Sequence, residues 1–188
     1  MITLISGTNR PGSNTFKVTH LLAEIYRELG VPTNLLDLQE LPAELFLPTS
    51  YAKKPASFAP FEVGVLEASG LVIVTPEYNG SFPGVLKLFI DHLKFPESFE
   101  ARPVCFVGLA AGVWGALRAV EQLQGVFGYR NAHIFPKRVF LPGINGMLGE
   151  DGQFNNADAT KRLREQSTDY VAFVEKLRGI NLRSAVLP

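Results

Sequence analysis

Short apolar runs alternate with longer amphipathic stretches along this chain. Runs that are apolar at nearly every position are typical of strands covered on both faces. The amphipathic stretches carry apolar residues at helical spacing, as at Val18, Leu22 and Ile25. The predicted strands are Met1–Ser6, Asn34–Leu38, Leu71–Thr75, Val104–Leu109 and a fifth near residues 132–141, and the predicted helices are Thr15–Leu29, Val85–Leu93, Ala116–Phe127 and Ala157–Leu177. This alternation predicts an α/β fold with a five-stranded parallel sheet and helices on both faces.

Prolines modify this pattern in two places. Pro136 separates Ala132–Phe135 from Arg138–Leu141, so the fifth strand should be bent or split. The segment Gln39–Pro60 is rich in proline and too irregular for a helix or strand of any length. We expect a long loop there, and such loops often carry function or subunit contacts.

Length and charge narrow the classes of function. The 188 residues predict a single domain, residues 1–188. Lys plus Arg and Asp plus Glu both number 18, so the charge does not favour binding to nucleic acid or to a membrane surface. The uncharged run Pro103–Leu117 is too short for a membrane helix, and the N-terminal residues do not resemble a signal peptide. The only cysteine, Cys105, is expected to be buried and inert, and a cytoplasmic location is the default.

Two loops that follow predicted strands carry unusual chemistry. The first, GTNRPGSNT at residues 7–15, places hydroxyl, amide and guanidinium groups just before a helix, which suits a phosphate group. An ordinary helix cap by Ser13 or Asn14 is the alternative explanation. The second, PEYNGSFPG at residues 76–84, combines an aromatic residue, polar residues and glycines at the carboxyl end of a strand. Ligands bind at that edge in open α/β sheets.

Together, GTNRPGSNT and PEYNGSFPGVLKLFID resemble the NADPH-dependent FMN reductase family of flavodoxin-like quinone, azo-dye and chromate reductases. The resemblance implies that the FMN phosphate is held by the first loop, and the ribityl chain and flavin ring by the second. The residues concerned are Thr8, Arg10, Ser13, Asn14 and Thr15 in the first loop, and Pro76, Glu77, Tyr78, Asn79 and Gly80 in the second.

A third loop, AAGVWG at residues 110–115, matches the family more loosely. By the same resemblance, Ala111 and Gly112 should lie near the pyrimidine end of the flavin, and Gly115 would also allow close backbone approach. Trp114 could line the flavin pocket or a subunit contact. Because tryptophan side chains are usually buried, we expect instead that Trp114 anchors the following helix in the core.

The resemblance implies an enzyme in which FMN takes hydride from NADPH or NADH and passes electrons, by a ping-pong mechanism, to a quinone, azo compound, metal oxyanion or free flavin. Such chemistry needs no catalytic side chain. A homodimer or homotetramer is also implied. A flavodoxin-type electron carrier and a flavin-binding sensor without turnover remain alternatives, although the balanced charge disfavours the carrier.

Other chemistries lack their motifs. The chain has no Walker loop, no GxGxxG fingerprint and no GxSxG elbow. Its three histidines are scattered, so no metal site is expected. Lys87 and Asp91 have the spacing of a structural ion pair on a helix. A preference for NADPH over NADH would need a basic side chain near the 2′-phosphate of NADPH. Lys53, Lys54 and Arg102 are the candidates.

Overall fold

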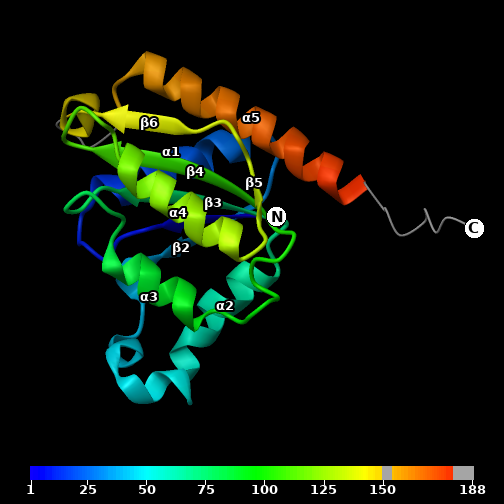
Figure 1. Ribbon diagram of the computed structural model, residues 1–188. Helices are drawn as coiled ribbons and strands as arrows, with labels where there is room; N and C mark the ends of the chain where they lie inside the picture. Colours follow the sequence, from blue (N-terminus) through cyan, green and yellow to red (C-terminus); the bar gives the residue numbers. More distant parts are fainter. Residues whose placement is uncertain (150–153, 180–188) are drawn as a thin grey trace, which may run out of the picture.

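The computed structural model describes residues 1–149 and 154–179 and contains one parallel sheet between two layers of helices (Figure 1). The strand order is β2-β1-β3-β4-β5, and β6 also pairs with β4. This is the flavodoxin-like order, as predicted. The strands are β1 Ile2–Ser6, β2 Thr33–Asp37, β3 Gly70–Pro76, β4 Pro103–Ala110, β5 His133–Ile134 and β6 Val139–Pro142.

The helices divide the core into two halves. The bounds are α1 Asn14–Glu28, α2 Ala59–Leu66, α3 Gly84–His92, α4 Leu117–Tyr129 and α5 Ala157–Gly179. Helices α1 and α5 cover one face of the sheet, and α2, α3 and α4 cover the other (Figure 1). Successive strand residues point to opposite faces, so Val72 packs under α1 and α5 whereas Ile73 packs under the other three helices. Because both faces are covered, the central strands are apolar throughout.

The split of the last strand at Pro136 is confirmed. Segments β5 and β6 pair with different parts of β4, at Pro103–Val104 and at Val107–Ala110. The buried side chain of Gln166 on α5 bridges the interruption, because its Nε2 donates to the Phe106 carbonyl at 3.0 Å and to the Lys137 carbonyl at 2.9 Å. A side-chain amide thus satisfies carbonyl groups at the break in the ladder.

Helix α2 was not predicted from the sequence. The preceding segment contains only short 3₁₀ turns, as expected of a region without long helices or strands, but an α-helix begins at Ala59. Pro60 lies in its first turn, where a backbone N–H has no partner within the helix. The sequence APFEVGVL is almost uniformly apolar and gives no amphipathic period, which explains why it was missed.

The proline-rich segment is fastened to the end of α3 through His92. The ring of His92 is buried, with Nε2 at 2.8 Å from the Ser50 hydroxyl and Nδ1 at 2.9 Å from the Leu88 carbonyl. Tyr51 stacks on the same ring at a centroid distance of 4.4 Å. On the exposed side of α3, Lys87 and Asp91 form the expected ion pair at 2.7 Å. These contacts give the last turn of α3 a structural role.

The most strongly perturbed titratable groups lie in the core between α1, α5 and the sheet. Cys105 is buried, as expected, and burial raises the pKa of its thiol. Burial likewise raises the pKa of Tyr26 and of Tyr170, whose hydroxyl donates to the Leu71 carbonyl at 2.9 Å. None of the described helices is both long and apolar enough to cross a membrane.

We predict that Gln166→Leu lowers the free energy of unfolding by about 2 kcal/mol, because two carbonyl groups lose their donor and one stays buried. Urea denaturation followed by circular dichroism measures the change. Gln39→Leu, at an exposed position, is the matched control and should change stability by less than about 0.5 kcal/mol. Equal stability of both variants would show that Gln166 does not support the split strand.

Candidate functional site

A crevice opens where the chain leaves β1 and β3 in opposite directions. These strands are adjacent and parallel, but β1 leads into α1 on one face and β3 leads toward α3 on the other. Such a switch point is where ligands bind in open α/β sheets. The crevice has a volume of about 440 Å³ and is lined by Arg10 to Thr15, Pro76 to Tyr78, Leu109 to Ala111, Ile144 and Asn145.

The first loop begins with a tight approach to β3 and ends at the beginning of α1. Gly7 donates from its N–H to the Val74 carbonyl at 2.8 Å, and a Cβ at this glycine would lie 2.7 Å from that oxygen. Ser13 caps α1 by accepting from the Phe16 N–H at 3.1 Å. The cap and an anion site are compatible, because the Ser13 hydroxyl can still donate and the other N–H groups of the first turn have no helical partner.

The second loop is a tight turn. Tyr78 and Ser81 exchange backbone hydrogen bonds of 2.8 and 3.0 Å, and the central residues Asn79 and Gly80 have φ of 52° and 78°. Positive φ at both positions is the signature of a type I′ turn, for which Asn-Gly is the preferred sequence. The hydroxyls of Tyr78 and Thr8 lie 2.9 Å apart, so this turn is tied to the first loop.

Helix α4 holds the second loop from the other side. Gln122 accepts from the Ser81 hydroxyl at 2.6 Å and donates to the Gly80 carbonyl at 3.1 Å. One helical turn earlier, Arg118 forms an ion pair with Glu77 at 3.2 Å. Arg118 and Gln122 were not predicted as site residues from the sequence. The available signal was their spacing, since polar side chains four residues apart lie on the same face of a helix.

Glu77 lines both the crevice and the neighbouring third loop, and Arg118 holds its carboxylate. The side chain is 14% exposed, and while Oε1 accepts from Arg118, Oε2 is buried without a hydrogen-bond partner among the described residues. A buried carboxylate oxygen without a donor is costly.

The third loop extends the crevice into a second hollow. This smaller space, about 220 Å³, is lined by Glu77, Asn79, Gly80, Ala110, Ala111, Gly112 and Trp114. The expectation that Trp114 anchors the core is wrong, because Trp114 is 56% exposed and Ala116 occupies the buried position before α4. Gly115 has φ 55° and packs its backbone against Pro142, so its role is to let the loop lie on β6.

The structure brings eleven of the twelve predicted site residues to these two adjoining hollows. The exception is Thr8, which is fully buried behind Tyr78 and also accepts from the Arg10 N–H at 3.3 Å. The segment after β6 was not predicted, yet Asn145 lines the crevice and accepts a 2.9 Å hydrogen bond from the Asn14 side chain. Its position beyond the carboxyl end of a strand was the available signal.

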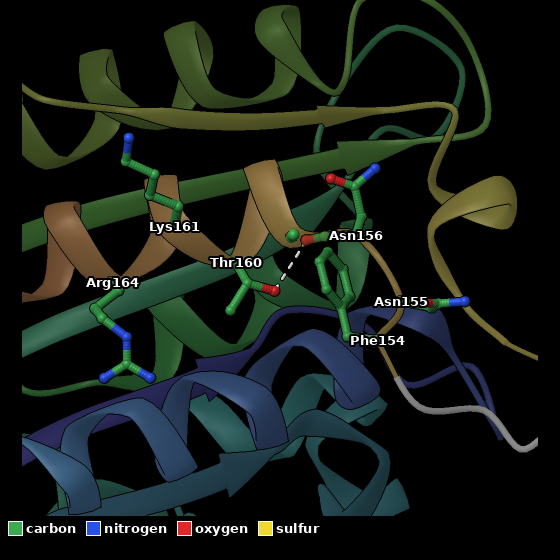
Figure 2. Close-up of a pocket in the computed structure, with 7 residues that line it drawn as sticks. Phe154, Asn155, Asn156, Thr160, Lys161 and Arg164 are labelled. Atoms are coloured by element: carbon green, nitrogen blue, oxygen red, sulfur yellow. Dashed lines mark hydrogen bonds between the residues drawn. The ribbon is translucent and has the colours of Figure 1, made fainter.

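Another hollow, of about 510 Å³, lies at the beginning of α5 (Figure 2). Its polar groups serve the helix itself, since Asn156 accepts from the Ala159 N–H and from the Thr160 hydroxyl, and Arg164 pairs with Glu28. Lys161 and Arg164 extend in opposite directions (Figure 2). The hollow therefore lacks the convergence of polar groups that distinguishes the crevice.

Similarity to known proteins agrees with the crevice. The sequence profile of the NADPH-dependent FMN reductase family matches residues 1–146. The chain belongs to this family. Members are NAD(P)H-dependent oxidoreductases that use FMN, and the family assignment makes the protein an enzyme of this kind.

Two curated relatives span nearly the whole chain. An NADPH azoreductase of Bacillus sp. (strain OY1-2) is 29% identical, over 95% of this chain and 98% of its own length. A quinone reductase of Escherichia coli (strain K12) is 27% identical, over 95% and 96%. Among solved structures, the flavoenzyme FerB, an NAD(P)H:(acceptor) oxidoreductase from Paracoccus denitrificans, has a TM-score of 0.78 at 22% identity, covering 93% of this chain and 97% of FerB. This likeness supports the flavodoxin-like fold.

The residues in the crevice fit FMN. The N-terminus of α1 offers backbone and hydroxyl donors to a phosphate, and the glycine-containing loops allow close approach to a planar ring. FMN thus matches the donors and the close backbone approach that this site presents.

We predict that Arg10→Ala weakens FMN binding roughly tenfold, because the loop loses a charge-assisted contact to the phosphate. Fluorescence titration of apoprotein with FMN measures the dissociation constant. Arg27→Ala, at the far end of α1, removes the same charge and serves as the control. An Arg10→Ala protein that purifies with full flavin occupancy and binds FMN like the control would contradict the assignment.

Proposed function

We propose that this protein binds FMN across its three strand-end loops and passes electrons from NAD(P)H to a small-molecule acceptor. The observation that carries the proposal is the convergence of these loops at the switch point between β1 and β3, with a helix N-terminus at one end. Azoreductase and quinone reductase relatives support small aromatic acceptors. A metal oxyanion and free flavin are the other acceptors that the family resemblance implies.

The proposed cofactor site uses each loop differently. Arg10, Ser13, Asn14 and Thr15 hold the phosphate, with Thr8 supporting them from behind. Pro76 to Gly80 hold the ribityl chain and the ring. Ala111 and Gly112 lie against the pyrimidine end.

When bound, FMN supplies the redox chemistry, because its ring accepts hydride from NAD(P)H and returns electrons to a second substrate. Pro76 to Gly80, Ala111 and Gly112 would hold the ring. We propose that NAD(P)H and the acceptor would then use the same site in turn, which is ping-pong order. The groups with strongly raised pKa values, Tyr26, Cys105 and Tyr170, belong to the core. We assign no catalytic side chain.

Arg102 lies just before β4 and donates to the Ser98, Ala68 and Glu97 carbonyls, and Lys54 pairs with Glu62. Because both cations are engaged within the protein, neither supports a preference for NADPH over NADH.

The family resemblance supports a homodimer or homotetramer. We also retain one domain over residues 1–188 and a cytoplasmic location as predictions from the sequence.

We predict that the purified protein is yellow, bleaches when NADPH or NADH is added without oxygen, and regains its colour when a quinone follows. Visible absorption spectroscopy measures all three states. Free FMN at the same concentration is the control, because its direct reduction by NADPH should be much slower.

The other outcomes separate the alternatives. A flavin that stays oxidised with NADPH and NADH but bleaches with dithionite would indicate an electron carrier or a sensor. A colourless protein that does not take up added FMN would overturn the cofactor site itself.

A further inference from the structure

The turn at residues 78–81 contains two backbone donors that the protein leaves unused. Tyr78 and Ser81 exchange the bonds that close the turn, whereas the N–H groups of Asn79 and Gly80 donate to no acceptor within the described residues. Both central residues have positive φ, and successive N–H groups in such a turn form a concave site for negative charge. Asn79 and Gly80 line the smaller hollow, where the ring of FMN is proposed to bind.

The conformation of this turn is only partly fixed by its own residues. Glycine adopts positive and negative φ about equally, so Gly80 can leave the turn conformation without steric cost. Apart from its chain neighbours, no heavy atom lies within 4 Å of the position that a Cβ of Gly80 would take, so packing around Gly80 does not hold it. Beyond the bonds that close the turn, the Gly80 peptide has one hydrogen bond in the described part of the chain, which its carbonyl accepts from Gln122 Nε2 at 3.1 Å.

Gln122 holds the turn from α4 with both ends of its side-chain amide. Its Oε1 accepts from the Ser81 hydroxyl at 2.6 Å, which leaves Nε2 to donate to the Gly80 carbonyl. Because an amide has one acceptor end and one donor end, the bond to Ser81 selects the orientation in which Nε2 reaches the carbonyl. Val120 and Leu123 on the same helix are fully buried, so α4 is a fixed base for this side chain.

The two hydrogen bonds of Gln122 contribute little to the stability of the fold. Gln122 is exposed, so these bonds replace bonds to water at a small net gain. Ordering a long glutamine side chain also costs conformational entropy. The bonds therefore act mainly on how often the turn adopts its observed conformation. When a binding-competent conformation is less populated, the apparent affinity for the ligand falls in proportion.

We propose that Gln122 is a positioning residue for the flavin ring, because it keeps the turn in the conformation that leaves the Asn79 and Gly80 N–H groups available to the ring. The inference rests on the proposed function, since these donors act only on a ring that binds in the smaller hollow. A flavin ring gains negative charge when it is reduced, and N–H donors directed at it favour the reduced form. Gln122 should therefore influence both the affinity for flavin and its reduction potential.

The test measures the binding of FMN and of riboflavin, which has the same ring but no phosphate, to the apoproteins by fluorescence titration. Gln122→Met should weaken the binding of both flavins roughly fivefold, because the turn acts on the ring that they share. Arg10→Ala should weaken the binding of FMN alone. Gln124→Met is the matched control, because the Gln124 amide accepts from Arg138 on the same helix and lines neither hollow. It should leave both dissociation constants within about twofold of the wild-type values.

Two further measurements separate positioning of the ring from a loss of structure. The midpoint potential of bound FMN, measured by equilibration with a reference dye, should be more negative in Gln122→Met than in the wild type and unchanged in Gln124→Met. The apoproteins of the two variants should unfold at the same urea concentration, because each loses only exposed or partly exposed hydrogen bonds.

The outcomes that overturn the inference differ from those that overturn the proposed function. Wild-type affinity of Gln122→Met for both flavins, an unchanged midpoint potential, or a loss of affinity confined to FMN would refute the role of Gln122. A wild-type protein that binds neither flavin would refute the cofactor site and this inference with it. A wild-type protein whose bound FMN is not reduced by NADPH or NADH would refute the reductase, and the comparison of the two glutamine variants would still test Gln122.

Discussion

The pairing of β1 with β3 is the constraint on which the rest of the site depends. The two strands run parallel and in contact, and Gly7 brings the first loop against the Val74 carbonyl where no side chain fits. From this point the chain departs to opposite faces of the sheet, so the two loops must separate. The crevice is therefore a consequence of strand order and crossover direction, and its polar side chains are placed at an opening that the topology creates.

The loops are held from outside as well as by their own turns. Gln122 and Arg118 of α4 bind the Gly80 carbonyl and the Glu77 carboxylate, and the Tyr78 hydroxyl reaches Thr8 behind the first loop. Fixing the loops in advance lowers the entropy lost when a ligand binds. The same contacts leave the buried Oε2 of Glu77 without a partner among the described residues, which costs stability.

The sequence predicts the parts of this fold where one physical signal dominates. Central strands covered on both faces appear as apolar runs, and α1 and α4 have a clear amphipathic period. Helix α2 was missed because a uniformly apolar stretch with a proline at its start carries no period. Trp114 was misplaced because burial statistics describe an average indole, whereas here Ala116 takes the buried position before α4. Asn145 was missed because only the fold brings it beside Asn14, which is distant in sequence.

A bound cofactor that carries the redox chemistry changes what the protein must supply. A side-chain acid or base would need a tuned pKa at the crevice, but the strongly raised pKa values here result from burial in the core under α1 and α5. The crevice instead provides hydrogen bonds, close backbone approach and an open edge. Trp114 lines the smaller hollow together with Glu77, and the guanidinium that lies over its ring is the one that pairs with Glu77. The wall of this hollow is therefore fixed to the second loop before any ligand enters.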